Sequence, residues 1–269
     1  MKLLFAFAAL ALAASGSAQP RPALSLARLD CGKLLIKDFN TFFSDTLEYP
    51  SGPRTVVASC YLIRHGDQYL MWDTGYPVSF KDQSKDLGPA VVSIDKTIAE
   101  QLAQLGLKPS DISVVGISHM HGDHVGQAQE FPQAKLIVGK GDFELTKGDN
   151  DPFKPWRVDG AKVQTMHGAD IDVFGDGSVV ALNLPGHTPD HMALLVKLAS
   201  GNVLLSGDLY HSREARAIKG IPPFNTNRAE TLASIDRFER LAKVLKAKVI
   251  IQHEPKDVAL LPAFPKWAQ

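Results

Sequence analysis

One short run of the sequence concentrates the side chains that could carry chemistry. From His119 to His124 it reads His-Met-His-Gly-Asp-His, which places three imidazoles and a carboxylate within six positions. Imidazole and carboxylate are ligands of divalent metals such as zinc. His119 and His121 are two residues apart and point the same way from an extended segment, while Asp123 and His124 can face a second ion. The alternative is a solvated polar loop, for which this spacing would be a coincidence.

Other polar side chains stand at the ends of predicted strands. Each of them comes directly after a short apolar segment: His119 after 112–117, His187 after 179–184, Asp208 after 203–205 and His253 after 248–251. Strand ends on a rigid scaffold can aim such groups into one cleft. The pattern therefore predicts that these four positions meet in the folded chain.

The remaining segments predict a layered α/β protein. Hydrophobic periodicity predicts a helix over 94–105 behind the cap Ser93 and another helix that begins after the cap Asn227. Segments 140–165 and 211–228 are predicted to be long loops, which are usually functional in a compact domain. Strands interleaved with helices favour the α/β class, and no linker divides the chain.

Charge and the N-terminal sequence restrict the partners and the location. Lys+Arg and Asp+Glu both number 29, so no net charge draws the protein to nucleic acid or to anionic membranes. We expect a small-molecule substrate and no nucleic-acid partner.

Residues 1–18 have one Lys, an apolar run and a small-residue end, which is typical of a secretory signal peptide. About 12 apolar residues are too few to span a bilayer, which needs ~20. We expect a secreted or periplasmic protein without stable membrane insertion, with one domain over 19–269.

Two features near the new N-terminus leave alternatives open. Cys31 and Cys60 would pair in an oxidising compartment, or they are buried thiols that act as small hydrophobic side chains. Leu24, Leu26 and Leu29 form an apolar stretch after the signal peptide. This stretch is a candidate contact of a homodimer.

The polar motifs together resemble those of the metallo-β-lactamase superfamily, and the resemblance extends over most of the chain after the signal peptide. It implies a four-layer αβ/βα sandwich and two divalent metal ions, with zinc as the first choice. The implied ligands are His119, His121 and His187 for one ion, Asp123, His124 and His253 for the other, and Asp208 as the bridge. A hydroxide between the ions would attack a carbonyl or phosphoryl centre, and Asp123 would transfer a proton to the leaving group.

Within the superfamily, the motifs resemble those of N-acyl-homoserine lactonases. The runs at 119–124, 185–191 and 253–255 look like theirs. This implies hydrolysis of the lactone ring, which quenches quorum signals. A broader ester, phosphotriester or β-lactam hydrolase with the same metals is the alternative. A non-catalytic binding protein is disfavoured, because no implied ligand is missing.

Two positions depart from that lactonase pattern. Many of these lactonases carry a Tyr three residues after the bridging Asp, where this chain has His211, with Tyr210 one position early. Tyr210 and His211 are therefore candidate catalytic residues that contact the substrate. Asp190 stands where Gly is common in the lactonases. The candidates for an apolar trough around an acyl tail are Met120, Phe153, Trp156, Tyr210 and Phe224.

Overall fold

The computed structural model describes residues 22–269. The strands in this part of the chain are β1 (Leu24–Ile36), β2 (Arg54–His65), β3 (Gln68–Trp72), β4 (Lys85–Asp86), β5 (Ala90–Ser93), β6 (Val114–Gly116), β7 (Lys135–Gly139), β8 (Val163–Met166), β9 (Ile171–Asp172), β10 (Val179–Asn183), β11 (Met192–Leu198), β12 (Gly201–Leu205) and β13 (Lys248–Ile250). The α-helices are α1 (Phe39–Phe43), α2 (Ile98–Gln104), α3 (Gly122–Val125), α4 (Lys140–Leu145), α5 (Arg213–Ile218), α6 (Arg228–Val244) and α7 (Pro255–Val258).

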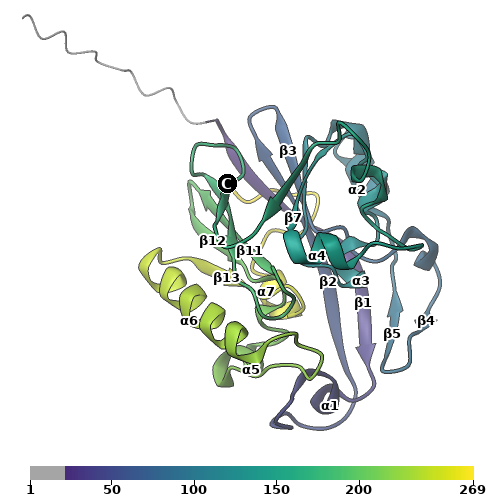
Figure 1. Cartoon of the computed structure of the whole chain (residues 1–269), viewed down its shortest axis with the longest axis vertical. Coiled ribbons are helices and arrows are strands. Elements are labelled where there is room, and N and C mark those ends of the chain that lie inside the picture. The colour runs from purple at the N-terminus through teal and green to yellow at the C-terminus, as the bar shows by residue number, and fades with distance from the viewer. Residues whose placement is uncertain (1–21) are drawn as a thin grey trace, which may run out of the picture.

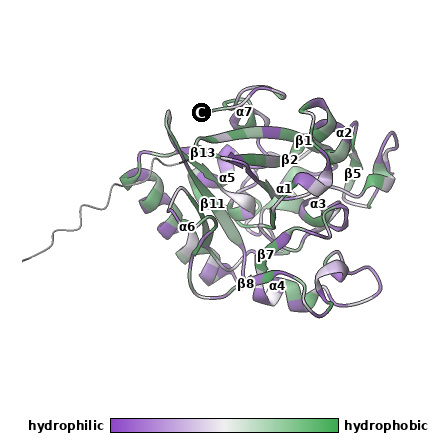
Figure 2. Cartoon of the chain, turned by 90° about the horizontal axis from the view of Figure 1, so that it is seen from above, coloured by the Kyte–Doolittle hydropathy of each residue, from purple (hydrophilic) through white to green (hydrophobic). Residues whose placement is uncertain are grey.

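These strands form two sheets with helices outside them. The larger sheet has the order β4-β5-β1-β2-β3-β6-β7-β8, and the smaller has the order β13-β12-β11-β10-β9. Buried side chains of both sheets, such as Trp72 and Leu194, belong to one apolar cluster between them. Helices α2 and α6 lie on opposite sides of the paired sheets (Figures 1 and 2). The expected four-layer αβ/βα sandwich is confirmed.

The helix caps confirm one sequence prediction and correct another. Asn227 caps α6, because its side chain accepts hydrogen bonds from the backbone N–H groups of Ala229 and Glu230. The predicted start of the other helix at Ser93 is wrong. Residues 90–93 pair with β1 as strand β5, and α2 begins instead behind a capping box formed by Thr97 and Glu100.

The structure also corrects expectations for the loops and for the N-terminal leucines. The predicted loop 140–165 contains α4 and the start of β8, and the predicted loop 211–228 contains α5. Leu26 and Leu29 are only 0% and 2% exposed, because β1 pairs with β2 in the middle of the larger sheet. Leu26 and Leu29 therefore cannot take part in the candidate homodimer contact, whereas Leu24 is half-buried.

The two cysteines are paired. A disulfide joins Cys31 on β1 to Cys60 on β2, which selects one of the two alternatives left open by the sequence. The predicted signal peptide, residues 1–18, lies outside the described residues. Within residues 22–269, none of the helices combines the length and the apolar character that a membrane span requires.

Candidate metal centre

The run from His119 to His124 lies where the end of β6 meets the short helix α3. Strand β6 is held between β3 and β7 inside the larger sheet, so the start of the run has a rigid support. The imidazoles of His119 and His124 are fully buried, whereas His121 and Asp123 remain partly accessible. One side of the run can therefore face a ligand or solvent.

The smaller sheet supplies the other three predicted ligands. His187 follows β10, Asp208 lies in a single 3-10 turn after β12, and His253 follows β13. All seven predicted ligands fall into two neighbouring groups, as the placement at strand ends indicated: His119, His121, His187 and Asp208 in the first group, and Asp123, His124 and His253 in the second.

In the first group, three ring nitrogens converge on one point. His121 Nδ1 lies 3.0 Å from His119 Nε2 and 3.1 Å from His187 Nε2. Asp208 Oδ2 lies 3.5 Å from both of these Nε2 atoms. Three imidazoles and one carboxylate oxygen around a common point make a ligand set for one divalent ion.

The second group shares Asp208 with the first through the other carboxylate oxygen. Asp208 Oδ1 lies 3.4 Å from His124 Nε2 and 3.0 Å from His253 Nε2. Asp123 completes this group, with its two oxygens 3.7 Å and 3.6 Å from the same two nitrogens. Since Oδ2 faces one group and Oδ1 the other, Asp208 is placed to bridge two ions.

The chemistry of these donor atoms fits divalent cations. His124 Nε2 and Asp208 Oδ1 are buried and have no hydrogen-bond partner among the described residues. Burial holds the pKa of His119 and of His187 well below the usual value, so both rings are neutral, as ligands must be. Burial would raise the pKa of Asp208, but His253 and His124 hold it well below its usual range. The carboxylate is therefore ionised.

Outer hydrogen bonds turn the second group toward the centre. Asp73 Oδ2 lies 3.0 Å from His124 Nδ1, and the backbone oxygen of Val57 accepts a hydrogen bond of 2.7 Å from His253 Nδ1. With Nδ1 engaged in each ring, Nε2 is left to face the site. Gln252 also donates to Asp73 Oδ2 over 2.7 Å, which joins the two supports.

His191 orients Asp208 from outside the two groups. Its Nε2 accepts a hydrogen bond of 2.9 Å from the backbone N–H of Asp208. Its Nδ1 therefore carries the proton and donates to the oxygen of Leu184 over 3.1 Å. Gly207 is required beside this ring, because a Cβ there would lie 2.5 Å from His191 Nε2 and the residue has φ +53°.

The protonation of His191 gives a testable dependence of stability on pH. Burial lowers the pKa of His191 to about 4 from 6.5. The unfolded chain therefore binds this proton first as the pH falls. The contribution of His191 to the free energy of unfolding is therefore fully present above pH 6.5 and decreases as the pH falls toward 4. In urea unfolding of the chelated protein, we expect the free energy of unfolding of the wild type to fall by about 3 kcal/mol more than that of His191→Gln between pH 6.5 and pH 4. Equal losses in both proteins would contradict this assignment.

Asp142, which the sequence analysis missed, ties together the loops that carry the first group. Its fully buried carboxylate accepts hydrogen bonds from Met120 N over 3.1 Å and from Thr188 Oγ1 over 2.7 Å. Asp190, the departure from the lactonase pattern, accepts a hydrogen bond of 2.6 Å from Gly141 N. Only the tertiary structure brings α4 beside both loops, so no local sequence signal marks Asp142.

The two candidate substrate contacts after Asp208 have different positions. Tyr210 is buried, and its hydroxyl donates to Glu239 over 2.8 Å. The expectation that Tyr210 lines the site is wrong, because its ring packs beside Phe238 of α6. His211 lines the cleft, and its Nε2 lies 3.1 Å from Asp208 Oδ2.

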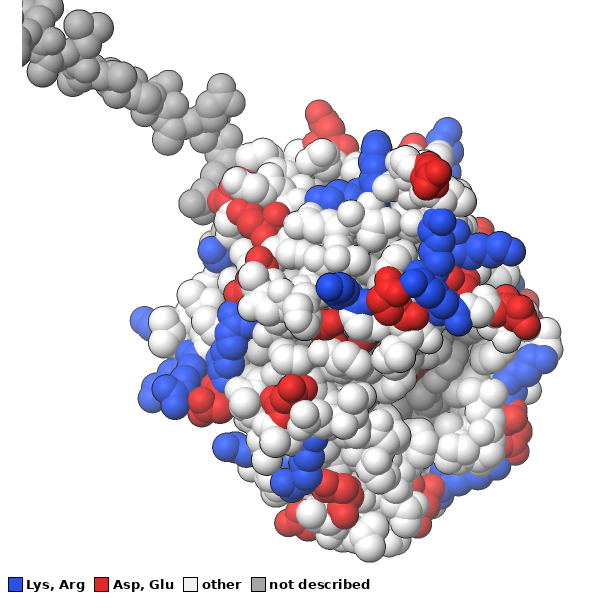
Figure 3. Space-filling model, in the orientation of Figure 1, with Lys and Arg blue, Asp and Glu red and all other residues white. Residues whose placement is uncertain are grey.

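A cleft of about 400 Å³ opens at the two groups. The surface is hollowed in the region of α3, and basic and acidic side chains are interspersed on the face that Figure 3 shows. The polar end of the cleft is formed by His121, Asp123, Asp208, His211 and His253. The rest of its wall is almost entirely apolar or aromatic: Leu34, Phe42, Phe43, Tyr76, Leu87, Pro89, Ala90, Val92 and Phe224.

Of the proposed trough residues, only Phe224 lines this cleft. Phe153 and Trp156 are core residues, 0% and 3% exposed, and Trp156 Nε1 donates to a backbone oxygen near β7. Met120 lines a neighbouring hollow on the other side of the run. The remaining apolar wall comes from β1, α1, the turn after β3 and the segment around β5, which are remote in sequence from the ligands.

Comparison with known proteins places this geometry in a family. Residues 53–253 match the family described as the metallo-beta-lactamase superfamily. An N-acyl homoserine lactonase AttM of Agrobacterium fabrum is 30% identical over 224 residues, which cover 77% of this chain and 85% of the relative. A variant of B. thuringiensis AiiA, solved with N-decanoyl-L-homoserine at its active site, has a TM-score of 0.77 at 22% identity, over 91% of this chain and 98% of that one. The dizinc quorum-quenching lactonase AidC has a TM-score of 0.64 at 17% identity, over 92% and 90%.

Proposed function

This chain belongs to the metallo-beta-lactamase superfamily, and we propose that it is a dinuclear-metal hydrolase that opens the lactone ring of N-acyl-homoserine lactones. The seven ligands are His119, His121, Asp123, His124, His187, Asp208 and His253. Zinc is the proposed metal, because imidazole and carboxylate donors suit it and because the structural neighbour AidC is a dizinc enzyme.

The apolar wall beside the ligands is the observation that supports this class of substrate. An acyl-homoserine lactone joins a neutral polar ring to an apolar tail, and the cleft is lined both by candidate ligands and by a larger set of apolar side chains. Burial of each CH₂ of the tail contributes about 0.8 kcal/mol. The named activity of the Agrobacterium relative and the N-decanoyl-L-homoserine bound to the AiiA variant support the same substrate class.

The residues of the site have separable roles in this reaction. When bound, two divalent ions would acidify a water molecule and polarise the lactone carbonyl. Asp208 sets the separation of the two groups, and His191 holds Asp208 in its orientation. Water adds to the carbonyl carbon, the ring C–O bond breaks, and the released ring oxygen takes up a proton. Asp123 lines the cleft, is partly accessible and is placed to deliver that proton.

Tyr76 supplies a hydroxyl to the cleft that the sequence analysis did not identify. Burial raises the pKa of Tyr76, and Asp123 and Asp208 raise it further, so the phenol keeps its proton. A protonated hydroxyl can donate to an oxygen of the substrate. We expect Tyr76→Phe to lower kcat/KM for the lactone about tenfold, the size of one lost hydrogen bond to a polarised oxygen.

Tyr210→Phe is the matched control for this prediction. It removes a hydroxyl that bonds to Glu239 outside the cleft, so kcat/KM should stay within about twofold of the wild-type value. Steady-state hydrolysis of hexanoyl and decanoyl homoserine lactone measures both variants. An unchanged kcat/KM in Tyr76→Phe would remove this residue from substrate binding.

We further propose that the protein is exported and that residues 19–269 act as one domain after removal of residues 1–18. The sequence of residues 1–18 supports this, as does the disulfide between Cys31 and Cys60, since disulfides persist in oxidising compartments. N-terminal analysis of protein recovered from the periplasm or medium should find a chain that begins after Ala18. Recovery of the uncut chain from the cytoplasm alone would contradict export.

A substrate panel tests the proposed reaction. Purified, zinc-loaded protein is assayed with acyl-homoserine lactones, a cephalosporin, paraoxon and S-lactoylglutathione. We expect the highest kcat/KM for the lactones, with an increase from short to long acyl chains because the longer tail buries more apolar surface. Brisk hydrolysis of another substrate without lactone opening would replace the lactonase proposal with the broader hydrolase alternative.

A further inference from the structure

The disulfide occupies an irregular point of the larger sheet. In the pairing of β1 with β2, Asp30 faces Ser59 and Gly32 faces Ala58, so Cys31 is the extra residue of a bulge. Its partner Cys60 belongs to the neighbouring regular part of β2. Both cysteines are completely buried. The bond therefore holds the bulge of β1 against β2 inside the molecule.

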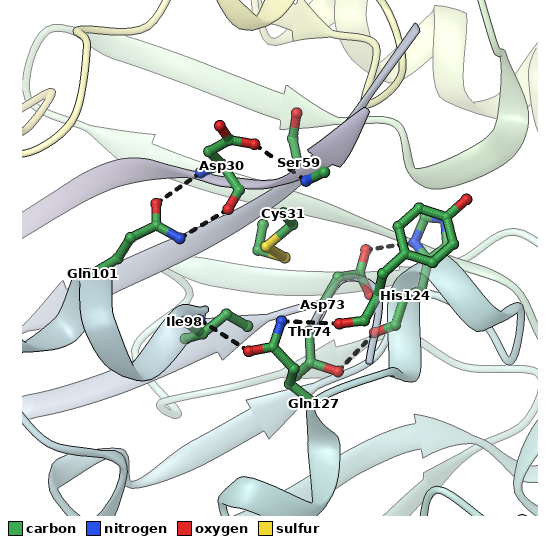
Figure 4. The surroundings of a disulfide bond; sticks show 12 residues. Asp30, Cys31, Ser59, Asp73, Thr74, Ile98, Gln101, His124 and Gln127 are labelled. Atoms are coloured by element: carbon green, nitrogen blue, oxygen red, sulfur yellow. Dashed lines mark hydrogen bonds and ion pairs between the residues drawn. A yellow bond between two sulfur atoms is a disulfide. The ribbon is translucent and has the colours of Figure 1, made fainter. Parts of the chain in front are cut away.

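One side of the disulfide contacts the turn that supports α3. A Cβ on Gly75 would lie 2.6 Å from the Cβ of Cys31 and 3.1 Å from its Sγ, so this turn packs directly on the bond. Thr74 N donates to the backbone oxygen of His124 over 2.7 Å. Asp73 Oδ2 lies 3.0 Å from the imidazole of the same residue. Figure 4 shows Asp73, Thr74 and His124 on this side of the disulfide.

The residues of β2 just before Cys60 hold the other end of the second group. Ser59 Oγ donates to the backbone oxygen of Gln252 over 3.0 Å, and Gln252 Nε2 donates back to the oxygen of Ser59 over 2.7 Å. Two residues earlier, the oxygen of Val57 accepts the 2.7 Å hydrogen bond from His253 Nδ1. The cross-linked strand thus positions His253 through backbone contacts.

The first group is supported mainly from elsewhere. Asp142 on α4 holds the backbone of Met120 and the side chain of Thr188, and these contacts do not involve β1 or β2. One link does reach the first group from the turn: Ser118 Oγ donates to Asp73 Oδ2 and lies 3.1 Å from His119 Nδ1. Asp73 therefore reaches His119 only through Ser118, whereas it contacts the imidazole of His124 directly.

We propose that the Cys31–Cys60 disulfide positions the second metal group, Asp123, His124 and His253, and that loss of the bond weakens metal binding there more than at the first group. The proposal rests on the assignment of the metal ligands above but not on the identity of the substrate. It gives the disulfide a role in the metal centre besides its contribution to stability.

The proposal can be tested with Co²⁺ as the probe in two variants, each of which keeps only one complete group of metal ligands. His187→Ala leaves the second group complete, and His253→Ala leaves the first group complete, while Asp208, which faces both groups, is kept in each background. The pair Cys31→Ala/Cys60→Ala is added to each, and Co²⁺ binding is followed by visible absorption and by metal content per chain. We expect the dissociation constant to rise at least tenfold in the His187→Ala background. In the His253→Ala background we expect a change of about twofold or less.

Leu198→Ala is the control for a general loss of stability. This side chain is 6% exposed at the end of β11, in the cluster between the sheets. It should destabilise the protein while it leaves cobalt affinity in both backgrounds unchanged. Equal weakening of both groups by the cysteine pair, or no weakening of either, would overturn the proposal. If the wild-type chain itself bound no Co²⁺, the proposed metal centre would fail instead.

A second measurement covers the case in which the cysteine variant does not fold. The folded, cobalt-loaded wild type is treated with a phosphine, which takes oxygen from water to become a phosphine oxide while the disulfide gains two electrons and two protons to give two thiols. Release of one Co²⁺ per chain well before the other, with the spectrum of the His253→Ala protein left behind, supports the proposal. Retention of both ions after complete reduction overturns it.

Discussion

Asp208→Ala is expected to reduce lactone hydrolysis by at least on the order of a thousandfold. Asp208 faces both groups, with Oδ2 toward His119 and His187 and Oδ1 toward His124 and His253. Without it, both groups would lose an anionic ligand that they share, and their separation would no longer be set. Metal content per chain and kcat/KM for a hexanoyl lactone measure the effect.

Asp149→Ala is the matched control, because it removes an exposed carboxylate from the loop after α4. It should retain two ions per chain and wild-type turnover. Full activity in Asp208→Ala with two bound ions would refute the dinuclear arrangement. Full activity with one ion per chain would show that a single group is sufficient for the reaction.

Removal of the metals should abolish hydrolysis and lower the stability of the protein. Ions that bind only the folded chain stabilise it by about 4 kcal/mol each when present at a thousand times their dissociation constant. The chelated protein also keeps two buried polar atoms, His124 Nε2 and Asp208 Oδ1, that have no hydrogen-bond partner within residues 22–269. We therefore expect a large fall in the melting temperature on chelation, and recovery of both activity and stability when zinc is added back.

Calorimetry and turnover before and after chelation test this expectation in the same samples. Zinc, manganese and cobalt should each restore activity to a different extent, because the same nitrogen and oxygen donors accept several divalent metals. Undiminished hydrolysis by protein that holds less than about a tenth of an ion per chain would contradict a metal mechanism.

Sequence patterns predicted well which candidate ligands come together in the folded chain, because the signal is local. The run from His119 to His124 contains four of them, and the other three follow apolar segments that do form strands β10, β12 and β13. The prediction that Ser93 caps a helix was wrong, because Ser93 pairs with β1 as part of strand β5. Its residue type suits a helix cap, but the pairing depends on a distant segment. The prediction for Leu26 and Leu29 also failed, because only the completed sheet shows that β1 lies in its middle.

The candidate site divides in the same way. The candidate ligands and their order along the chain could be predicted from the sequence alone, because metal chemistry depends on side-chain type and short spacing. The wall of the cleft was decided by the tertiary structure, which brings Phe42, Tyr76 and Phe224 from remote segments to one place and turns Tyr210 away toward Glu239. Residue types alone cannot predict which side chains line the cleft, since the lining depends on which faces the packed sheets and helices leave open.

The run from His119 to His124 is therefore recognisable as half of a metal site from its residue types and spacing alone. The fold determines what surrounds that site: a wall for an apolar tail, Asp142 behind the first group, and a disulfide beside the second. Each of these depends on contacts between segments far apart in the chain. Ligand chemistry is local and can be read from the sequence, whereas the surroundings of the ligands come from long-range packing.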